Sequence, residues 1–446
     1  MKLAYCSPLN PIKSGISDYS EDLLPLLKEY FEIDIYVSGF SPDNKYIKQE
    51  FNIYDIKRFK SNHTKKHYDC NLYQMGNNHL AHEWIYEQAL HEPGIVVLHD
   101  FAIHHMMAAM TVGRGKTELY LDEMQYAHGD KGFQAALSFI KGQAPPPWED
   151  RAIEFPMNKK LIESAKGVIV HSYYTRNLIK EVFPYIPIQV IPHYTKICNA
   201  PINDYEMARI ELGIKENTNV IATFGFVTPA KRLDKILTAL VRLHRDGYEF
   251  KFYIVGEVPG EIEAKISQSG LPDDMVVLTG HVKLTLFLQY MKASDICVNL
   301  RYPVHGETSG SLHRLLGMGK PVLVSNVGSF REYPDDAVIK IDVTHKEEDQ
   351  IYEALKLLLD NPQKKLEIGN IGYTYAKEHL DIEKVAKAYR YFIEGVVNER
   401  YPLENLVVPV SKLLAELDLD NNEQLMKECA SVFPIYNRCQ TSIFSS

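Results

Sequence analysis

The sequence predicts an α/β protein made of two successive halves, each built on a parallel sheet. Short apolar runs typical of buried strands alternate with amphipathic helical segments along most of the chain. This alternation restarts near residue 204, after a segment that carries Asn199, Pro201 and Asn203. A chain of 446 residues is too long for one hydrophobic core, so two domains of about 200 residues each are expected.

The bulk composition excludes several classes of protein. Hydrophobic residues make up 45% of the chain and charged residues 24%, which are ordinary values for a globular protein. The net charge of -9 argues against a nucleic-acid-binding protein, because such proteins carry a basic excess. The polar N-terminus, Met1 to Pro8, predicts no signal peptide, and no apolar window of about 18 residues predicts a membrane span. We therefore expect a cytoplasmic protein.

The cysteines predict neither disulfides nor a zinc site. They are scattered without a CxxC pair, and several lie in apolar runs: Cys6, Cys70, Cys198, Cys297, Cys429 and Cys439. This pattern is typical of small buried side chains in a reducing compartment.

The first half opens with a strand, a glycine loop and a helix. Leu3 to Cys6 is the strand, Ser14 to Ser17 ends the loop, and Asp18 and Glu21 open an amphipathic helix. Ile33 to Val37 follows as the next strand. This order is Rossmann-like, but the GxGxxG fingerprint is absent, so a nicotinamide cofactor is not supported.

His99 is the first candidate for contact with a substrate. It follows the buried strand Gly94 to Leu98, and ligands of open α/β sheets bind at the carboxyl ends of strands. The alternative is that His99 and Asp100 only finish the strand and cap the next helix. A mostly helical insertion, about 111–165, follows, and strands at Gly167 to Val170 and Ile188 to Ile191 complete this half.

Lys57 to His67 is predicted to be a basic surface loop. Its residues are expected to be solvated, and contact with an anionic membrane surface or an acidic acceptor is the alternative. His63 and His67 are four residues apart, but they lack neighbouring acidic residues, so a metal site is disfavoured.

The second half presents two cations after its first strand. Lys231 and Arg232 end the loop between the strand Val220 to Phe224 and the helix Leu233 to Leu243, where cations could meet a pyrophosphate. Two solvent-exposed cations are the alternative, although positive charge at a helix start opposes the helix dipole. Further elements are expected at Phe250 to Val255, Val276 to Thr279 and Leu284 to Lys292.

The stretch from Asp295 to Phe330 predicts an anion-binding turn. A buried strand, Ile296 to Leu300, leads into the polar cluster Glu307 to Gly310, then into a helix with one apolar face and the strand Pro321 to Ser325. Such a turn offers free backbone N–H groups and a helix N-terminus. Glu307 beside it suggests a ligand that also carries hydroxyl groups. An ordinary strand-to-helix loop with a capping Ser or Thr is the alternative.

The C-terminal part predicts a long amphipathic helix, Ile382 to Val397, and a tail with further helical pattern, 401–446. Asp418 and Asp420 have the spacing of a metal-binding DxD motif, but no strand precedes them, so we interpret them as surface charge.

Taken together, these motifs resemble retaining glycosyltransferases of the family 4 type. The resemblance covers most of Met1 to about Val397, and it is strongest in GFVTPAKRLDKIL (Gly225 to Leu237) and LRYPVHGETSGSLHRLLGMGKPVLVS (Leu300 to Ser325). It implies the GT-B fold, in which two Rossmann-like domains face each other across a cleft. The domains implied are 1–200 on the acceptor side, 201–380 on the donor side, and C-terminal helices and tail at 381–446.

The resemblance also implies roles for individual residues. Lys231 would neutralise the donor diphosphate, Glu307 would contact the donor sugar as the first acid of the EX7E motif, and His99 would lie near the reacting centre. The implied donor-binding residues are Gly15, Gly225, Lys231, Arg232, Glu257, His281, Glu307, Thr308, Ser309, Gly310 and Arg314. Arg314 stands near the position of the second acid, and Phe226 stands where an Arg often follows the glycine of the second half.

The implied reaction moves a sugar from a nucleoside diphosphate sugar to a hydroxyl of a glycan, glycolipid or polysaccharide precursor. The resemblance implies retention of anomeric configuration, no metal and no cofactor, in a bacterial polysaccharide pathway. Contact with the inner face of the membrane is an open alternative. A sugar-nucleotide epimerase of similar fold and a non-catalytic sugar-nucleotide-binding subunit also stay open.

Overall fold

The computed structural model describes residues 1–197 and 201–398, which form two compact units. Of these residues, the first unit comprises Met1–Ala144, Phe155–Ile191 and 386–398, and the second comprises Pro145–Glu154, 192–197 and 201–385. The predicted tail 401–446, its Asp418–Asp420 motif and three of the cysteines lie outside the described residues. The predicted domain limits stay predictions.

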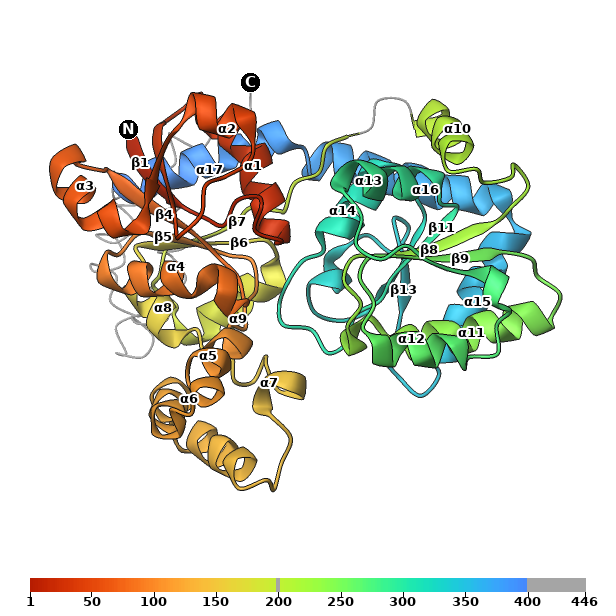
Figure 1. Cartoon of the computed structure of the whole chain (residues 1–446), viewed down its shortest axis with the longest axis horizontal. Coiled ribbons are helices and arrows are strands. Elements are labelled where there is room, and N and C mark those ends of the chain that lie inside the picture. The colour runs from red at the N-terminus through yellow and green to blue at the C-terminus, as the bar shows by residue number, and fades with distance from the viewer. Residues whose placement is uncertain (198–200, 399–446) are drawn as a thin grey trace, which may run out of the picture. The chain divides into compact units, whose positions relative to one another are not determined.

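The first unit is built on a seven-stranded parallel sheet with the order β3-β2-β1-β4-β5-β6-β7 (Figure 1). Its strands are β1 Lys2–Cys6, β2 Glu32–Val37, β3 Asn52–Asp55, β4 Cys70–Met75, β5 Ile95–Leu98, β6 Gly167–Val170 and β7 Ile188–Val190. Its helices are α1 Gly15–Leu27, α2 Lys45–Glu50, α3 Phe59–Lys66, α4 His79–His91, α5 His104–Met110, α6 Thr117–Ile140, α8 Lys159–Ser164 and α9 Tyr173–Val182. The central strands are apolar along their whole length because helices bury both faces.

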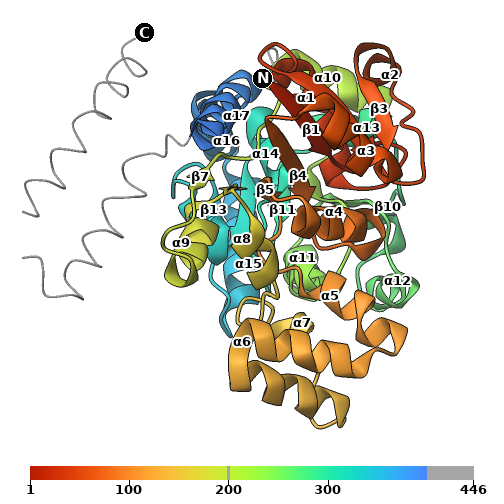
Figure 2. The ribbon, with the colours of Figure 1, turned by 90° about the vertical axis from the view of Figure 1, so that its left-hand side faces the viewer.

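The predicted helical insertion is a helical hairpin that projects away from this sheet (Figure 2). Gly129, with φ 61° and ψ -154°, breaks α6 into two helical segments, because only glycine adopts this backbone conformation readily. The short helix α7, Pro147–Asp150, follows the hairpin.

The second unit is built on a six-stranded parallel sheet with the order β10-β9-β8-β11-β12-β13. Its strands are β8 Val220–Phe224, β9 Lys251–Val255, β10 Val276–Leu278, β11 Ile296–Asn299, β12 Val322–Ser325 and β13 Ile339–Ile341. Its helices are α10 Pro201–Glu211, α11 Leu233–Arg245, α12 Gly260–Ser267, α13 Leu284–Ala293, α14 Gly310–Gly317, α15 Glu347–Asp360 and α16 Pro362–His379. Helix α17, Ile382–Val397, runs from the end of this unit into the first.

Two separate hydrophobic cores cover the faces of this sheet. One core contains α11, α12 and α15, and the other contains α14 and α16 with part of α13, and these two sets of helices lie on opposite sides of the sheet in Figure 1. The sheet therefore exposes only its edges, and the carboxyl ends of β8 and β11 lie beside each other because these strands pair in parallel.

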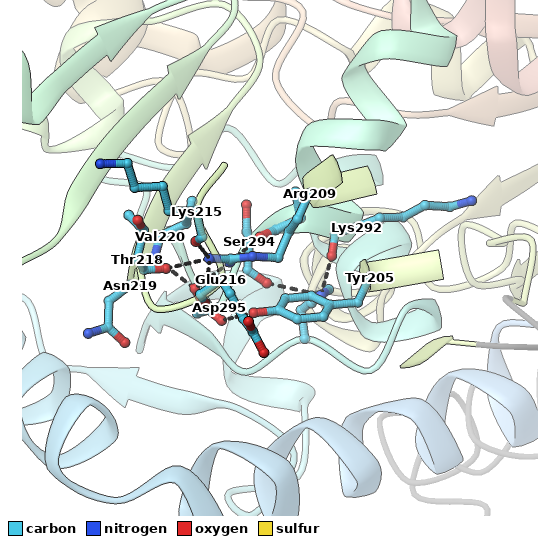
Figure 3. A network of polar contacts seen from close by, with 12 residues as sticks. Tyr205, Arg209, Lys215, Glu216, Thr218, Asn219, Val220, Lys292, Ser294 and Asp295 are labelled. Carbon is cyan, nitrogen blue, oxygen red and sulfur yellow. Dashed lines mark hydrogen bonds and ion pairs between the residues drawn. The ribbon is translucent and has the colours of Figure 1, made fainter. Parts of the chain in front are cut away.

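A buried ion pair fastens α10 to the amino ends of the central strands β8 and β11 (Figure 3). Arg209 Nη1 lies 3.1 Å from Asp295 Oδ2, and Asp295 also accepts hydrogen bonds from the backbone N–H of Val220 and from the Tyr205 hydroxyl. The Arg209 guanidinium also donates to backbone carbonyls of the loop before β8 and at the end of α13. This network closes the end of the sheet that lies away from the carboxyl ends.

The structure corrects the prediction of a basic loop at Lys57 to His67. Phe59–Lys66 is helix α3, preceded by a 3₁₀ turn at Ile56–Arg58. Phe59 is buried against the ring of Tyr36, at 4.7 Å between centroids, and Lys66 forms an ion pair with the buried Asp34. Phe59 is the one buried residue of α3. The segment therefore shows no apolar repeat from which a helix could be predicted.

Other boundaries also differ from the predictions. Helix α1 begins at Gly15 rather than at Asp18, because the Ser14 side chain accepts from the Ile16 backbone N–H and caps the helix there. Helices α12, α15 and α16 and strand β13 were not predicted, and they complete the second unit.

Candidate functional site

Two glycines allow a close approach of the backbone at the carboxyl ends of β8 and β9. Gly225 has a φ of 87°, and a Cβ atom on Gly256 would lie 2.5 Å from the carbonyl oxygen of Gly225. Larger residues would therefore separate the ends of β8 and β9, and the positive φ at Gly225 also favours glycine. The two glycines bring the backbone after β8 close to the side chain of Lys231.

Lys231 is the central residue of the site. It ends a 3₁₀ turn, Pro229–Lys231, and its buried ammonium donates to the carbonyl of Phe224. Burial, and then the positive charge of Arg301, lower the pKa of Lys231 to about 7. A buried amine with this pKa is poised to meet an anion, which would favour its charged form.

Helix α14 begins at the same place. A Cβ atom on Gly225 would lie 3.1 Å from Lys231 Nζ and 3.9 Å from Ser311 Oγ, so the first turn of α14 lies beside the lysine. The side chain of Ser309 caps this helix by accepting from the Leu312 backbone N–H, and it also donates to Asn299 Oδ1. The positive end of the helix dipole adds to the charge of Lys231.

Glu307 is a buried carboxylate held by an arginine. Its Oε1 lies 2.9 Å from Arg301 Nη1, and its Oε2 accepts from the His305 backbone N–H at 2.6 Å. Burial alone would raise the pKa of Glu307, but the charge of Arg301 and the hydrogen bond from the His305 backbone bring it below its ordinary value. Glu307 is therefore ionised near neutral pH, and the carboxylate and Arg301 hold each other in place.

The remaining predicted residues of the second unit surround this centre. Thr308 lies between Glu307 and the cap of α14, and Arg314 lies on the partly buried side of α14. Glu257 and His281 are exposed and follow Gly256 and Gly280, which pair across an isolated antiparallel β-bridge beyond β9 and β10.

Arg232 has a partner inside the second unit. Its guanidinium forms a two-point ion pair with Glu347 at the start of α15, with 3.0 Å between Nε and Oε1. This pair ties the loop after β8 to α15. A role for Arg232 toward a diphosphate stays a prediction, and Lys231 lies beside the first turn of α14.

The first unit contains the two other predicted residues. Gly15 is exposed at the N-terminus of α1, where a Cβ atom would meet no atom within 4 Å. His99 follows β5 and is buried, and both ring nitrogens have partners: Nε2 lies 2.7 Å from Gln74 Oε1, and Nδ1 lies 3.0 Å from His171 Nε2.

Sequence analysis missed three residues that the structure places at this site. Arg301 follows β11 and reaches both Lys231 and Glu307 electrostatically. Ser311 faces Gly225, and the imidazole of His193 would lie 3.3 Å from a Cβ atom on Gly310. Arg301 carried a usable signal, since it stands directly after a buried strand and six residues before Glu307.

Neither a metal-binding cluster nor a membrane-spanning helix is found among the described residues. No group of three or more His, Cys, Asp or Glu side chains in 1–197 and 201–398 is placed to hold a metal ion. In the same residues, no helix has the length and apolar character needed to cross a membrane.

Comparison with known proteins identifies the domain that contains this site. Residues 204–375 match the family model described as glycosyl transferases group 1. The matched residues lie within the second unit. A D-inositol 3-phosphate glycosyltransferase from Segniliparus rotundus is 24% identical over 196 residues. That match covers 42% of this chain and 43% of the relative, so less than half of the relative's length is spanned.

Solved structures resemble nearly the whole chain. Sucrose-phosphate synthase from Thermosynechococcus elongatus matches with a TM-score of 0.60 and 15% identity, over 89% of this chain and 100% of that one. Anabaena HepE in complex with UDP and glucose matches with a TM-score of 0.61 and 14% identity, over 89% and 100%. A glycosyltransferase from Rickettsia africae reaches a TM-score of 0.62 at 10% identity, over 89% and 98%. These likenesses and the two parallel sheets confirm the predicted GT-B class of fold, with two Rossmann-like units.

Proposed function

We propose that the protein is a glycosyltransferase that moves a sugar from a nucleoside diphosphate sugar to a hydroxyl acceptor. The observation that carries the proposal is the buried, partly deprotonated Lys231 between Gly225 and the first turn of α14, with Arg301 close enough to lower its pKa. The match of residues 204–375 to group 1 glycosyltransferases supports it. The UDP and glucose bound to HepE support a uridine diphosphate sugar as the first donor to try.

The second unit would bind the donor by its diphosphate. Lys231 and the N-terminus of α14, with backbone and hydroxyl donors of Thr308, Ser309 and Gly310, would neutralise the diphosphate. Glu307, fixed by Arg301, would accept hydrogen bonds from hydroxyls of the donor sugar. Glu257 and His281 would lie toward the nucleoside, and Arg314 would take the place of the acid that usually binds ribose.

The transfer would proceed without a metal ion. The bond between the anomeric carbon and the diphosphate oxygen breaks, a bond from that carbon to the acceptor oxygen forms, and the acceptor proton passes to the departing phosphate. As the diphosphate leaves, the charge of Lys231 and the dipole of α14 stabilise its growing negative charge. Attack on the same face would retain the anomeric configuration.

The acceptor side belongs to the first unit in this proposal. Gly15, at the exposed N-terminus of α1, would let that loop approach the donor, and His99 would lie near the reacting centre. A glycan, glycolipid or polysaccharide precursor is the proposed acceptor. The exposed cations of the 3₁₀ turn and α3, Lys57, Arg58, Lys60 and Lys65, would favour work at the inner face of a membrane.

A product assay tests the proposal and separates it from two alternatives. The protein is incubated with nucleoside diphosphate sugars, with and without hydroxyl acceptors, in the presence of EDTA, and products are separated by mass and anomeric configuration. We expect free nucleoside diphosphate and a glycoside only when an acceptor is present. Conversion of the donor without an acceptor would indicate an epimerase, and binding without any turnover would indicate a sensor or assembly subunit.

A further inference from the structure

A series of buried polar groups runs through the first unit beside the carboxyl end of β5. The proposed transfer gives a role to one of them, His99. We call it the histidine network, and it consists of Tyr19, Tyr389, Gln74, His99, His171 and the carbonyl of Ile191. These groups come from α1, α17, β4 and the ends of β5, β6 and β7. All five side chains are buried.

The direction of the hydrogen bonds is determined at Ile191. His171 Nδ1 lies 2.7 Å from the carbonyl oxygen of Ile191, and a carbonyl oxygen can only accept, so Nδ1 carries a hydrogen. Burial lowers the pKa of His171 to about 4, so its ring is neutral near pH 7 and its Nε2 is an acceptor. Since that Nε2 lies 3.0 Å from His99 Nδ1, His99 must donate from Nδ1.

The second nitrogen of His99 faces an amide. His99 Nε2 lies 2.7 Å from Gln74 Oε1, which would require a hydrogen on Nε2 as well and would make His99 an imidazolium. The burial of His99 disfavours that charge. In this arrangement Gln74 Nε2 is also buried without a hydrogen-bond partner among the described residues.

A half-turn of the Gln74 amide gives both His99 Nε2 and Gln74 Nε2 a suitable hydrogen-bond partner. It exchanges the oxygen and the nitrogen, so that Gln74 Nε2 donates to His99 Nε2 and Gln74 Oε1 faces the tyrosine hydroxyls. The amide lies close enough to Tyr5 and Tyr389 to act on the pKa of both phenols. Tyr19 Oη lies 2.8 Å from Tyr389 Oη, so Tyr19 can donate to Tyr389, and Tyr389 can donate to the amide oxygen.

We propose that His171 is a positioning residue that holds His99 as the neutral tautomer with its hydrogen on Nδ1, while the Gln74 amide nitrogen donates to His99 Nε2. Tyr19 supports the ring from the side, edge-on, at 4.8 Å between centroids. Both nitrogens of His99 are then used inside the first unit. His99 therefore acts as a fixed neutral group and exchanges no proton with the substrates, a consequence that rests on the proposed glycosyl transfer.

Nitrogen NMR of the full chain with labelled histidine tests the tautomer directly. Signals are assigned with His99→Gln and His171→Gln, and the two rings are observed near pH 7. We expect both rings to be neutral with the hydrogen on Nδ1. A doubly protonated His99, or a hydrogen on Nε2 of either ring, would overturn the proposal.

Two substitutions at His171 separate positioning from packing. His171→Gln keeps an acceptor for His99 Nδ1, whereas His171→Phe keeps the ring volume and removes the acceptor. We expect His171→Phe to change the His99 signals and to lower kcat by about tenfold or more with little change in donor KM, whereas His171→Gln stays within about threefold of the parent. Unchanged His99 signals in His171→Phe would refute the positioning role.

Gln74→Glu provides an independent variant should His171→Phe fail to fold. A carboxylate beside His99 Nε2 stabilises the imidazolium, so His99 should become doubly protonated near pH 7. A His99 that stays neutral in this variant would show that Gln74 does not face Nε2. The spectra need no turnover, so a chain that shows the predicted tautomers and transfers no sugar would refute the proposed function while leaving the network in place.

Discussion

At Lys231, folding lowers the pKa of an amine from 10.5 to about 7. Between these two values the unfolded chain holds a proton that the folded chain lacks, so the stability of the ligand-free protein should rise with pH across this window. A bound diphosphate would favour the charged amine and raise the pKa of Lys231 again.

Binding of a nucleoside diphosphate should therefore take up a proton. At pH 8 the phosphates are already ionised and Lys231 is mostly neutral, so we expect uptake of about one proton per ligand. Calorimetry in two buffers of different ionisation enthalpy measures this number. In Lys231→Met the uptake should vanish and the affinity should fall, and an uptake that persists in this variant would assign the proton to another group.

Glu307 should matter more for the sugar than for the nucleotide. In Glu307→Gln the side chain can still accept from the His305 backbone N–H, but it no longer holds the charge of Arg301. We expect transfer to fall by about 100-fold while binding of the nucleoside diphosphate alone changes by less than about tenfold. Rates and affinities from one preparation check this, and parent-like transfer would remove Glu307 from the sugar site.

The sequence predicted the centre of this site because its residues lie in loops and turns whose composition is recognisable between strands and helices. Lys231 ends a glycine-containing loop after a strand, and Glu307 stands in a polar turn before a helix. Arg301 was missed because its importance comes from reaching Lys231 and Glu307 in space, which sequence spacing does not reveal. The pairing of Arg232 with Glu347 was missed for the same reason, since 115 residues separate them.

At the scale of elements, α10 depends on the buried ion pair of Arg209 and Asp295. The Asp295 carboxylate also receives the backbone N–H of Val220, so removing it leaves a buried cation and a buried donor unpaired. We expect Asp295→Ala to destabilise the second unit by about 2–4 kcal/mol, measured by denaturant unfolding.

A neighbouring surface pair supplies the control. Lys292 and Asp204 are 2.8 Å apart, with side chains 32% and 37% exposed. Lys292→Ala should therefore change the free energy of unfolding by less than about 1 kcal/mol. Equal effects of the two substitutions would contradict the structural role of the buried pair.

Helices and strands were predicted where buried apolar residues recur at a regular spacing along the sequence. Ten of the strands and the helices α11, α13 and α14 were predicted from apolar runs and repeats, to within a few residues, whereas β3, β4 and β13 were not predicted. Helix α3 was predicted as a loop because Phe59 is its only buried residue, and the other side chains are polar. Its ion pair with Asp34 is a tertiary contact that composition does not show.

At the scale of the whole molecule, the alternation of strands and helices predicted two α/β halves, and the resemblance of the motifs to glycosyltransferases implied the GT-B class of fold. The short strand β13 and the helices α15 and α16 completed the second unit without having been predicted. Helices α15 and α16 cover the sheet through contacts with residues far apart in sequence, and β13 joins the edge of the sheet by pairing with β12.

We propose above all that the second unit binds the diphosphate of a sugar donor through Lys231 without a metal. The most direct measurement is thermal stability against a panel of nucleoside diphosphates and their sugars, with EDTA, for the parent, Lys231→Met and Lys235→Met. Lys235 is a matched control, because it lies four residues away and pairs with Glu348 on the surface.

A ligand at about 100 times its dissociation constant should stabilise the parent and Lys235→Met by about 2.7 kcal/mol. We predict such a shift with one class of nucleoside diphosphate, unaffected by EDTA and lost in Lys231→Met. No shift across the panel, or an equal shift in Lys231→Met, would contradict the account.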